Sequence, residues 1–307
     1  MCEGKEGIVS LIGKTPTIRL RNIEKYFGLG AEIYAKLEMH NPTGSVKDRA
    51  AYFMIEDAYR RGLIGEKCTI IEPTSGNLGI SLAMLSTLYG YKLKIVMPEG
   101  VSSERISLIN AYGGQVVLSP RVESMAGAIR MAEEIHNEIK TSIMLSQFTN
   151  KMNVRSHYLT TGPEIYSEMN GQIDYFIAGV GSGGTIGGVG QYLKKMLCNV
   201  KILAVEPSES AVLSGNRSGV HRIQGIGAGF IPPLIDKAMI DIVMTASSDE
   251  AEEFMGVLVR REGILAGISS GAVLSQAVRI ARVEENCRKK IVILLADGGE
   301  KYLSVVR

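Results

Sequence analysis

Residues 175–185 read Tyr-Phe-Ile-Ala-Gly-Val-Gly-Ser-Gly-Gly-Thr, an apolar run that passes directly into a glycine-rich loop. The run Tyr175–Ala178 is short and apolar, as a strand buried on both faces of a parallel sheet must be. The segment Ile186–Leu197 after the loop has the apolar spacing of an amphipathic helix. A strand, a glycine-rich turn and a helix in this order predict an α/β protein.

Short Val- and Ile-rich runs alternate with longer amphipathic stretches over almost the whole chain. The expected strands are Cys68–Glu72, Leu93–Met97, Gln115–Leu118, Tyr175–Ala178, Lys201–Val205, Ile240–Met244 and Lys290–Leu295. The expected helices are Val46–Arg61, Leu78–Tyr89, Glu104–Tyr112, Val122–Lys140, Val154–Met169, Ile186–Leu197, Asp249–Arg261 and Gly271–Val283. This alternation predicts two doubly wound open sheets, and composition alone places no boundary between them.

The loop Gly179–Thr185 predicts an anion site, because bare backbone N–H groups and the positive end of a helix bind phosphate. The loop also matches the dinucleotide pattern G-x-G-x-x-G, and Glu206 ends the next strand, where a ribose-binding carboxylate stands in such proteins. A nicotinamide-dependent dehydrogenase is therefore one alternative. The additional Gly183 and Gly184 gather more donors around one point than a pyrophosphate needs, which favours a compact phosphate monoester.

A second glycine-rich turn, Gly267–Gly271, matches the nucleophile pattern G-x-S-x-G around Ser269. That hydrolase fold needs a histidine after the serine, but every histidine of the chain precedes Ser269. Ser269 is better interpreted as a helix cap or as a hydroxyl that faces a bound ring.

The segment Asn41–Arg49 reads Asn-Pro-Thr-Gly-Ser-Val-Lys-Asp-Arg. Ser45 and Asp48 form an S-x-x-D capping pattern, which places Lys47 in the first turn of a helix. The positive end of the helix there favours the neutral amine, which is the form that Schiff-base chemistry requires. A solvated surface lysine is the alternative. A phosphate site together with an activated lysine points to pyridoxal phosphate.

A third turn, Thr74–Gly79, contains two hydroxyl groups, an amide and the backbone N–H groups of Gly76 and its neighbours. Such a strand-to-helix turn can bind a carboxylate without a formal positive charge. It is equally compatible with a simple cap of the following helix.

The chain has 307 residues, with 34 Lys and Arg against 32 Asp and Glu. This near-neutral balance gives no reason to expect nucleic acid or an anionic membrane as a partner. No apolar run reaches the roughly 18 residues of a spanning helix, and the first residues lack a signal-peptide core, so we expect a cytoplasmic protein. The four cysteines, Cys2, Cys68, Cys198 and Cys287, lack metal-type spacing, so we expect reduced thiols and no metal site.

Taken together, these motifs resemble those of the cysteine synthase (O-acetylserine sulfhydrylase) and cystathionine β-synthase family of fold-type II pyridoxal-phosphate enzymes. The matching landmarks are Ile12–Pro16, Lys36–Glu38, Ser45–Arg49, Pro73–Gly79, Met97–Glu99, Gln147–Asn150, Thr161–Ile165, Gly179–Thr185, Val205–Pro207, Ile223–Pro232, Gly267–Gly271 and Asp297–Leu303. They run nearly from end to end. Glu206 belongs to one of them, which leaves the dehydrogenase as a remote alternative.

The resemblance implies a tryptophan synthase β-like architecture with the active site between two domains. Residues 1–38 and 149–307 would form the larger, phosphate-binding domain, and residues 39–148 the smaller, mobile, substrate-binding domain. The implied catalytic residue is Lys47, which would hold the cofactor and then act as the base that removes the Cα proton. The implied cofactor-binding residues are Lys47, Asn77, Gly181, Ser182, Gly183, Gly184, Thr185 and Ser269, and the implied substrate-binding residues are Thr74, Ser75, Gly76 and Gln147.

The implied reaction is β-replacement on a β-substituted L-alanine through an aminoacrylate intermediate. The first expectation is a homodimeric cysteine synthase that makes L-cysteine from O-acetyl-L-serine and sulfide. Two departures leave the donor open: Leu78 stands where relatives usually have Thr, and His40 lies in an altered stretch before the lysine. A cysteine-consuming, hydrogen-sulfide-producing enzyme that forms lanthionine, cystathionine or serine is therefore the alternative. Because the landmarks begin near residue 12 and end near residue 303, we expect a catalytic core without haem-binding or regulatory extensions.

Overall fold

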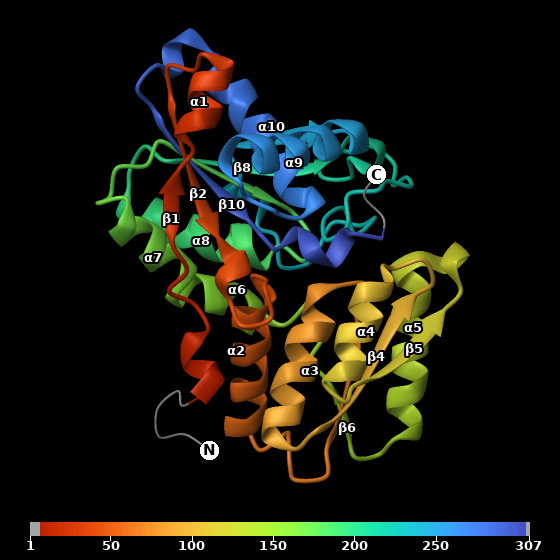
Figure 1. Ribbon diagram of the computed structural model, residues 1–307. Helices are drawn as coiled ribbons and strands as arrows, with labels where there is room; N and C mark the ends of the chain where they lie inside the picture. Colours follow the sequence, from red (N-terminus) through yellow and green to blue (C-terminus); the bar gives the residue numbers. More distant parts are fainter. Residues whose placement is uncertain (1–6, 305–307) are drawn as a thin grey trace.

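The computed structural model describes residues 7–304, apart from the side chain of Ser124, and Cys2 lies outside this range. The chain forms two open sheets with helices on both faces of each (Figure 1). The larger sheet has the strand order β1 (Thr17–Arg19), β2 (Glu32–Leu37), β10 (Lys290–Leu295), β7 (Tyr175–Gly179), β8 (Lys201–Pro207) and β9 (Ile242–Ala246). The smaller sheet has the order β5 (Gln115–Ser119), β4 (Lys92–Pro98), β3 (Thr69–Pro73) and β6 (Ser142–Met144).

All neighbouring strands pair in parallel except β1 and β2. The central strands are apolar because helices cover both of their faces: β3 is buried at each of its residues, and β10 is buried from Ile291 onward. The helices are α1 (Arg21–Phe27), α2 (Lys47–Arg60), α3 (Asn77–Tyr89), α4 (Ser103–Ala111), α5 (Ser124–Glu138), α6 (Lys151–Leu159), α7 (Thr161–Glu168), α8 (Gly184–Met196), α9 (Ser248–Glu262) and α10 (Ile268–Ala281).

The expected strands and helices are present with bounds shifted by at most three residues, with one exception. The helix expected over Val154–Met169 is two helices, α6 and α7, because Thr160 leaves helical geometry with φ −126° and ψ −69°. The capping pattern of Ser45 and Asp48 is right only for Ser45, whose Oγ accepts a 3.3 Å hydrogen bond from the backbone N–H of Lys47 at the start of α2. The Asp48 carboxylate accepts hydrogen bonds from Thr43 and Ser81 instead, while the backbone of Ser45 forms a β-bridge with Asp297.

The carboxyl ends of the two sheets face one another across the region where ligands bind in open α/β sheets. Residues that directly follow β3, β7 and β10 line the same cavity, although they lie far apart in the sequence. Strands from residues 69–144 build the smaller sheet, and strands from residues 17–37 and 175–295 build the larger one. The domain boundaries at 38/39 and 148/149 stay a prediction.

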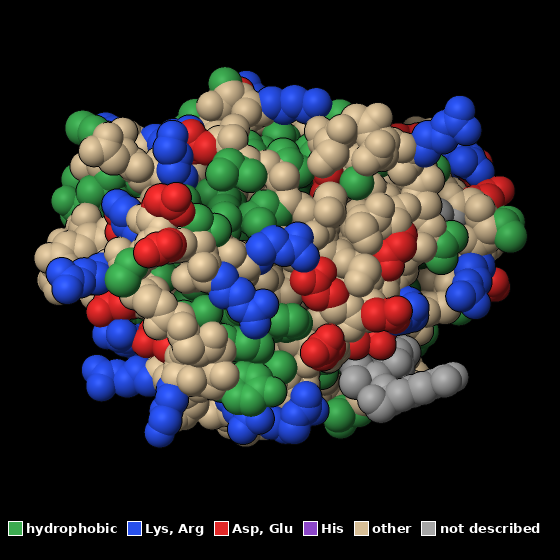
Figure 2. Space-filling view, turned by 90° about the horizontal axis from the view of Figure 1, so that it is seen from above, with side chains coloured by type: hydrophobic (Ala, Val, Ile, Leu, Met, Phe, Trp, Pro, Cys, Tyr) green, Lys and Arg blue, Asp and Glu red, His purple; other side chains and the backbone are tan. Residues whose placement is uncertain are grey.

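The surface carries no broad field of one charge on the face seen in Figure 2, where Lys and Arg side chains intermix with Asp and Glu. This arrangement agrees with the near-neutral composition. Within residues 7–304, no helix is long and apolar enough to cross a membrane.

Candidate active site

A cavity of about 470 Å³ lies where the two sheets meet. Its volume falls in the range of pockets that bind small molecules and cofactors. The structure brings every site residue expected from the sequence into its lining: Lys47, Thr74, Ser75, Gly76, Asn77, Gln147, Gly181, Ser182, Gly183, Gly184, Thr185 and Ser269. Leu78 also lines the cavity, whereas His40 is exposed at the end of a 3-10 helix and does not.

Lys47 is the first residue of α2 and extends into the cavity. Desolvation lowers the pKa of its amine to about 8, and the negative charge of Asp297 opposes this shift. The helix end invoked from the sequence is therefore not the main cause. The Nζ atom lies 3.4 Å from Oγ of Ser182, so the amine reaches the glycine-rich loop. A half-buried amine with this pKa is a nucleophile near neutral pH.

The loop between β7 and α8 presents backbone donors to the cavity. Gly183 has a φ of +84°, a left-handed conformation that favours glycine, and it caps α8. A Cβ atom on Gly181 would clash with the carbonyl oxygen of Gly225. Because the first N–H groups of a helix have no intrahelical acceptor, Gly184 and Thr185 leave donors for an anion. The sequence-predicted anion site therefore has the required local geometry.

The loop between β3 and α3 forms another wall of the cavity. The hydroxyl of Thr74 accepts a 3.3 Å hydrogen bond from the backbone N–H of Gly76, just before α3 begins at Asn77. Gln147 is buried, and its side-chain amide lies 3.4 Å from the carbonyl oxygen of Pro73. Hydroxyl, amide and helix-end N–H groups gathered in this way can bind a carboxylate.

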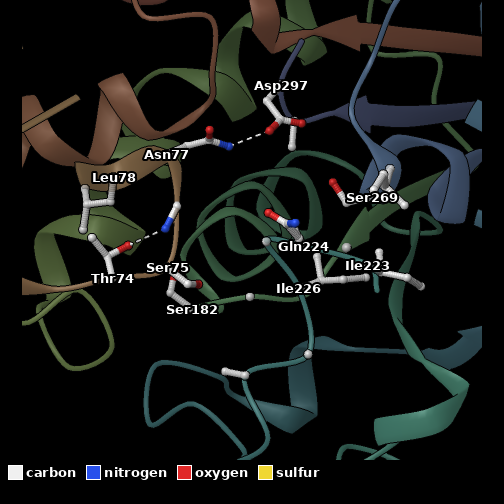
Figure 3. A pocket seen from close by; sticks show the side chains of 18 of the residues that line it. Thr74, Ser75, Asn77, Leu78, Ser182, Ile223, Gln224, Ile226, Ser269 and Asp297 are labelled. Atoms are coloured by element: carbon white, nitrogen blue, oxygen red, sulfur yellow. Dashed lines mark hydrogen bonds between the residues drawn. The ribbon is translucent and has the colours of Figure 1, made fainter. Parts of the chain in front are cut away.

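Asn77 and Ser269 stand on different sides of the cavity (Figure 3). The Asn77 side chain points toward Asp297, and its Nδ2 donates a 2.6 Å hydrogen bond to that carboxylate. Ser269 is buried in the first turn of α10, which Gly267 caps. A planar ring between them would meet an amide at one edge and a hydroxyl group at the other.

Sequence reasoning missed several residues that support these loops. Asn153 and His157 lie on α6, where His157 Nε2 is 3.3 Å from Oγ1 of Thr185. Burial and the nearby Arg49 cation lower the pKa of His157 to about 3, so its imidazole is neutral. The signal was present in the sequence: Asn153 and His157 are four residues apart and share one face of the helix.

The carboxylate of Glu206, invoked for the dehydrogenase, has a different role. It is buried and accepts hydrogen bonds from the backbone N–H groups of Leu213 and Ser214 at 2.8 and 2.9 Å. Glu206 does not line the cavity. The carboxylate is therefore occupied in holding a loop, which removes one of the two features that favoured a nicotinamide dinucleotide.

The cavity fits pyridoxal phosphate on three observations. The glycine loop lies close against the Gly225 backbone, where a Cβ on Gly181 would clash, and the helix start that follows leaves backbone N–H groups for a phosphate. Lys47 supplies an amine of lowered pKa for an aldehyde. Among residues 7–304, the buried Oδ1 atoms of Asn77 and Asp297 find no hydrogen-bond partner, although buried polar atoms normally have one.

Comparison with known proteins points to the same cofactor. Residues 8–297 match the family described as pyridoxal-phosphate dependent enzyme. A cysteine synthase from Staphylococcus aureus is 46% identical over 300 residues, which cover 97% of this chain and 96% of the relative. A cystathionine β-synthase from Apis mellifera is 45% identical over 97% of this chain and 60% of its own length.

A solved structure extends the agreement to the fold. The hydrogen sulfide-producing enzyme from Fusobacterium nucleatum superposes with a TM-score of 0.94 at 43% identity, covering 97% of this chain and 99% of the other. The α/β fold with two doubly wound sheets of the fold-type II architecture is thereby confirmed, as is the resemblance found in the sequence. The chain belongs to the family of pyridoxal-phosphate dependent enzymes.

Proposed function

We propose that this protein catalyses β-replacement on a β-substituted L-alanine, with Lys47 as its catalytic residue. The observation that carries the proposal is the position of the Lys47 amine, which has a pKa of about 8 and lies 3.4 Å from Ser182 of the glycine loop. The amine lines the same cavity as the expected phosphate site and the expected carboxylate-binding turn, which supports this role. The identity to a cysteine synthase over almost the whole chain supports the same reaction class.

The residues of the cavity divide the task among them. Pyridoxal phosphate, when bound, supplies the electron-withdrawing ring that makes the Cα–H bond of an amino acid acidic. The loop Gly181–Thr185 would hold its phosphate, Asn77 its ring hydroxyl and Ser269 its ring nitrogen. A neutral hydroxyl at the ring nitrogen does not stabilise a positive charge there, which favours rapid loss of the β-substituent. Lys47 would hold the cofactor and then accept the Cα proton at Nζ.

The substrate carboxylate would bind to Thr74, Ser75, Gly76 and Gln147. We also propose that residues 39–148 move as the smaller domain over the bound substrate and exclude water. The protein is further proposed to be a homodimer. Size-exclusion chromatography with light scattering tests this, and a monomeric mass at micromolar concentration would contradict it.

We propose O-acetyl-L-serine as the donor and sulfide as the nucleophile, so that acetate leaves the β-carbon and L-cysteine forms. The similarity to the cysteine synthase of Staphylococcus aureus supports this assignment. A cysteine-consuming reaction that releases hydrogen sulfide is the second candidate. Leu78 favours it, because an apolar side chain lines the cavity where a hydroxyl would otherwise stand beside the substrate. The similarity to the hydrogen sulfide-producing enzyme points the same way.

The deciding experiment offers the purified holoenzyme O-acetyl-L-serine, O-phospho-L-serine, L-serine and L-cysteine separately, with and without sulfide. A sulfide electrode records consumption or release, and chromatography identifies the amino-acid product. Sulfide consumption with O-acetyl-L-serine supports the first candidate, whereas release from L-cysteine alone supports the second. Lys47→Ala is the control and should lack both the visible absorbance band and all turnover. A colourless wild-type protein that no added cofactor reconstitutes would overturn the proposal.

A further inference from the structure

Asn153 lies between the two loops that form the cofactor and substrate sites. Its side chain is almost completely buried, with 1% of its surface exposed. The amide Nδ2 donates hydrogen bonds to the backbone carbonyl oxygen of Gln147 at 2.8 Å and to Oγ of Ser182 at 2.9 Å. A single NH₂ group therefore joins the carboxylate-binding segment to the glycine loop.

The orientation of this amide is determined by its partners. An NH₂ group has two hydrogens, so it can satisfy two acceptors at the same time. A flipped amide would place Oδ1 against the carbonyl oxygen of Gln147, where two acceptors would repel each other. The Oδ1 atom has no hydrogen-bond partner within residues 7–304, so no other contact competes for the orientation.

Glycines on α8 make room for Asn153. A Cβ atom on Gly184 would overlap the Asn153 amide, and one on Gly188 would overlap the backbone of Val154. Helices α6 and α8 can approach this closely only because both positions lack a side chain. The same close approach brings Asn153 to the start of α8, where the glycine loop ends.

The backbone of Gln147 is held from its other side by Glu72, which is completely buried at the end of β3. One carboxylate oxygen of Glu72 accepts the N–H of Gln147 at 2.8 Å, and the other accepts the N–H of Ser146 at 2.8 Å. Gln147 is thus fixed at its N–H by Glu72 and at its C=O by Asn153. Within residues 7–304, Asn153 donates a hydrogen bond to Ser182, whereas Glu72 makes none to that residue.

We propose that Asn153 is a positioning residue that fixes the substrate-binding segment and the cofactor-binding loop relative to each other. This inference rests on the proposed function, because it takes Gln147 as a substrate contact and Ser182 as a cofactor contact. Asn153 acts through these two residues. Glu72 holds only the segment that contains Gln147. Substitutions of Asn153 and of Glu72 should therefore differ in their effect on cofactor affinity.

The test measures two quantities on each variant: the dissociation constant of pyridoxal phosphate for the apoprotein, by fluorescence titration, and the KM of the holoenzyme for its amino-acid donor. Asn153→Ala should weaken cofactor binding about 10-fold and raise KM about 10-fold, since each lost bond leaves a buried oxygen unpaired. Glu72→Gln should raise KM while cofactor affinity changes less than about 2-fold. If Asn153→Ala does not fold, Asn153→Ser replaces it with the same expectation.

Asn150→Ala is the matched control. Asn150 precedes the same helix, accepts a capping hydrogen bond from Met152 and donates one to the carbonyl oxygen of Leu145, but within residues 7–304 its side chain bonds neither Gln147 nor Ser182. Its loss should lower the melting temperature and leave both measured constants unchanged. If Asn150→Ala changes them as much as Asn153→Ala does, the effect is general destabilisation and the inference is wrong.

A double variant tests whether Asn153 acts through Gln147. In a Gln147→Ala background, Asn153→Ala should no longer raise KM but should still weaken cofactor binding. An Asn153→Ala protein with wild-type affinity and KM would overturn the inference while leaving the proposed function intact. A wild-type protein that binds no pyridoxal phosphate would instead overturn the proposed function.

Discussion

The amide of Asn77 donates a 2.6 Å hydrogen bond to the carboxylate of Asp297, 220 positions later in the chain. Asn77 begins α3 beside the smaller sheet, and Asp297 follows β10 of the larger sheet. The hydroxyl of Tyr302 donates to the same carboxylate oxygen. One buried carboxylate therefore orients a side chain that faces the proposed cofactor ring.

Replacement of Asp297 by Asn should weaken cofactor binding. The variant exchanges a charged acceptor for a neutral amide, so Asn77 loses a charge-assisted bond and we expect about 10-fold weaker binding of pyridoxal phosphate. Fluorescence titration of the apoprotein measures this. Tyr302→Phe keeps both the charge and the Asn77 contact, and it should change the affinity less than about 3-fold. An Asp297→Asn protein that binds as tightly as wild type would contradict the expected role.

Cofactor uptake should follow the titration of Lys47. Its pKa is about 8, and the neutral amine is the form that reacts with an aldehyde. The uptake rate of the apoprotein should therefore rise about 10-fold per pH unit below pH 8 and level off above it. Visible absorbance after stopped-flow mixing records the rate. The control is a free lysine derivative with a pKa of about 10.4, and its rate of reaction with pyridoxal phosphate should level off only at higher pH.

The pH profile of the cofactor uptake rate should move to lower pH in Asp297→Asn. The Asp297 charge raises the pKa of Lys47 against the effect of burial, so its removal should shift the midpoint below pH 8. Tyr302→Phe retains the charge and should keep the wild-type midpoint. A shift to higher pH in Asp297→Asn would show that Asp297 does not act on Lys47 through its charge.

Glu38→Gln should destabilise the fold. Glu38 is completely buried and pairs with Arg49 at 2.8 Å. Removing one partner of a buried ion pair costs about 3–5 kcal/mol, which we expect as the loss in free energy of unfolding at pH 7 by urea titration. Arg60→Ala removes an ion pair in which Arg60 is largely exposed, and it should cost less than about 1 kcal/mol.

The destabilisation by Glu38→Gln should also depend on pH. Burial opposes ionisation of Glu38, but the Arg49 cation prevails and lowers its pKa to about 2, from 4.5 in the unfolded chain. Stability from this carboxylate is complete above pH 4.5 and is lost as the pH falls toward 2. The difference between wild type and variant should therefore shrink below pH 4.5. If the difference in free energy of unfolding grows on acidification, the lowered pKa of Glu38 is contradicted.

Two glycines near the start of α8 should respond differently to Ala. A Cβ atom on Gly181 would strike the Gly225 carbonyl oxygen, so Gly181→Ala should displace the loop and weaken cofactor binding at least about 10-fold. A Cβ atom on Gly187 would have its nearest neighbour at 3.6 Å, an ordinary contact. Gly187→Ala should keep the affinity and raise the free energy of unfolding by about 0.5–1 kcal/mol through helix propensity. Equal losses of affinity in both variants would contradict the proposal that Gly181 shapes the phosphate-binding loop.

Elements with a strong apolar pattern could be predicted from the sequence, and weakly patterned ones could not. Strand Lys290–Leu295 has the expected bounds because residues 291–295 form an uninterrupted apolar run. Strand β2 was missed: it contains Glu32 and Lys36, and Lys36 is buried only because Glu164 and Glu168 of α7 pair with it. Such a partner is distant in the sequence, so a local pattern cannot reveal it.

The sequence by itself determined the α/β class, the three glycine-rich or hydroxyl-rich turns and the amine of Lys47, because each depends on the residues of one short segment. Tertiary structure alone decided how those segments work together. Burial rather than the helix end lowers the pKa of Lys47, and Asp297, Asn153 and Glu72 reach the site only through the packing of helices and sheets. The physical reason is that desolvation and hydrogen-bond geometry depend on neighbours in space, whereas turn chemistry depends on neighbours in the chain.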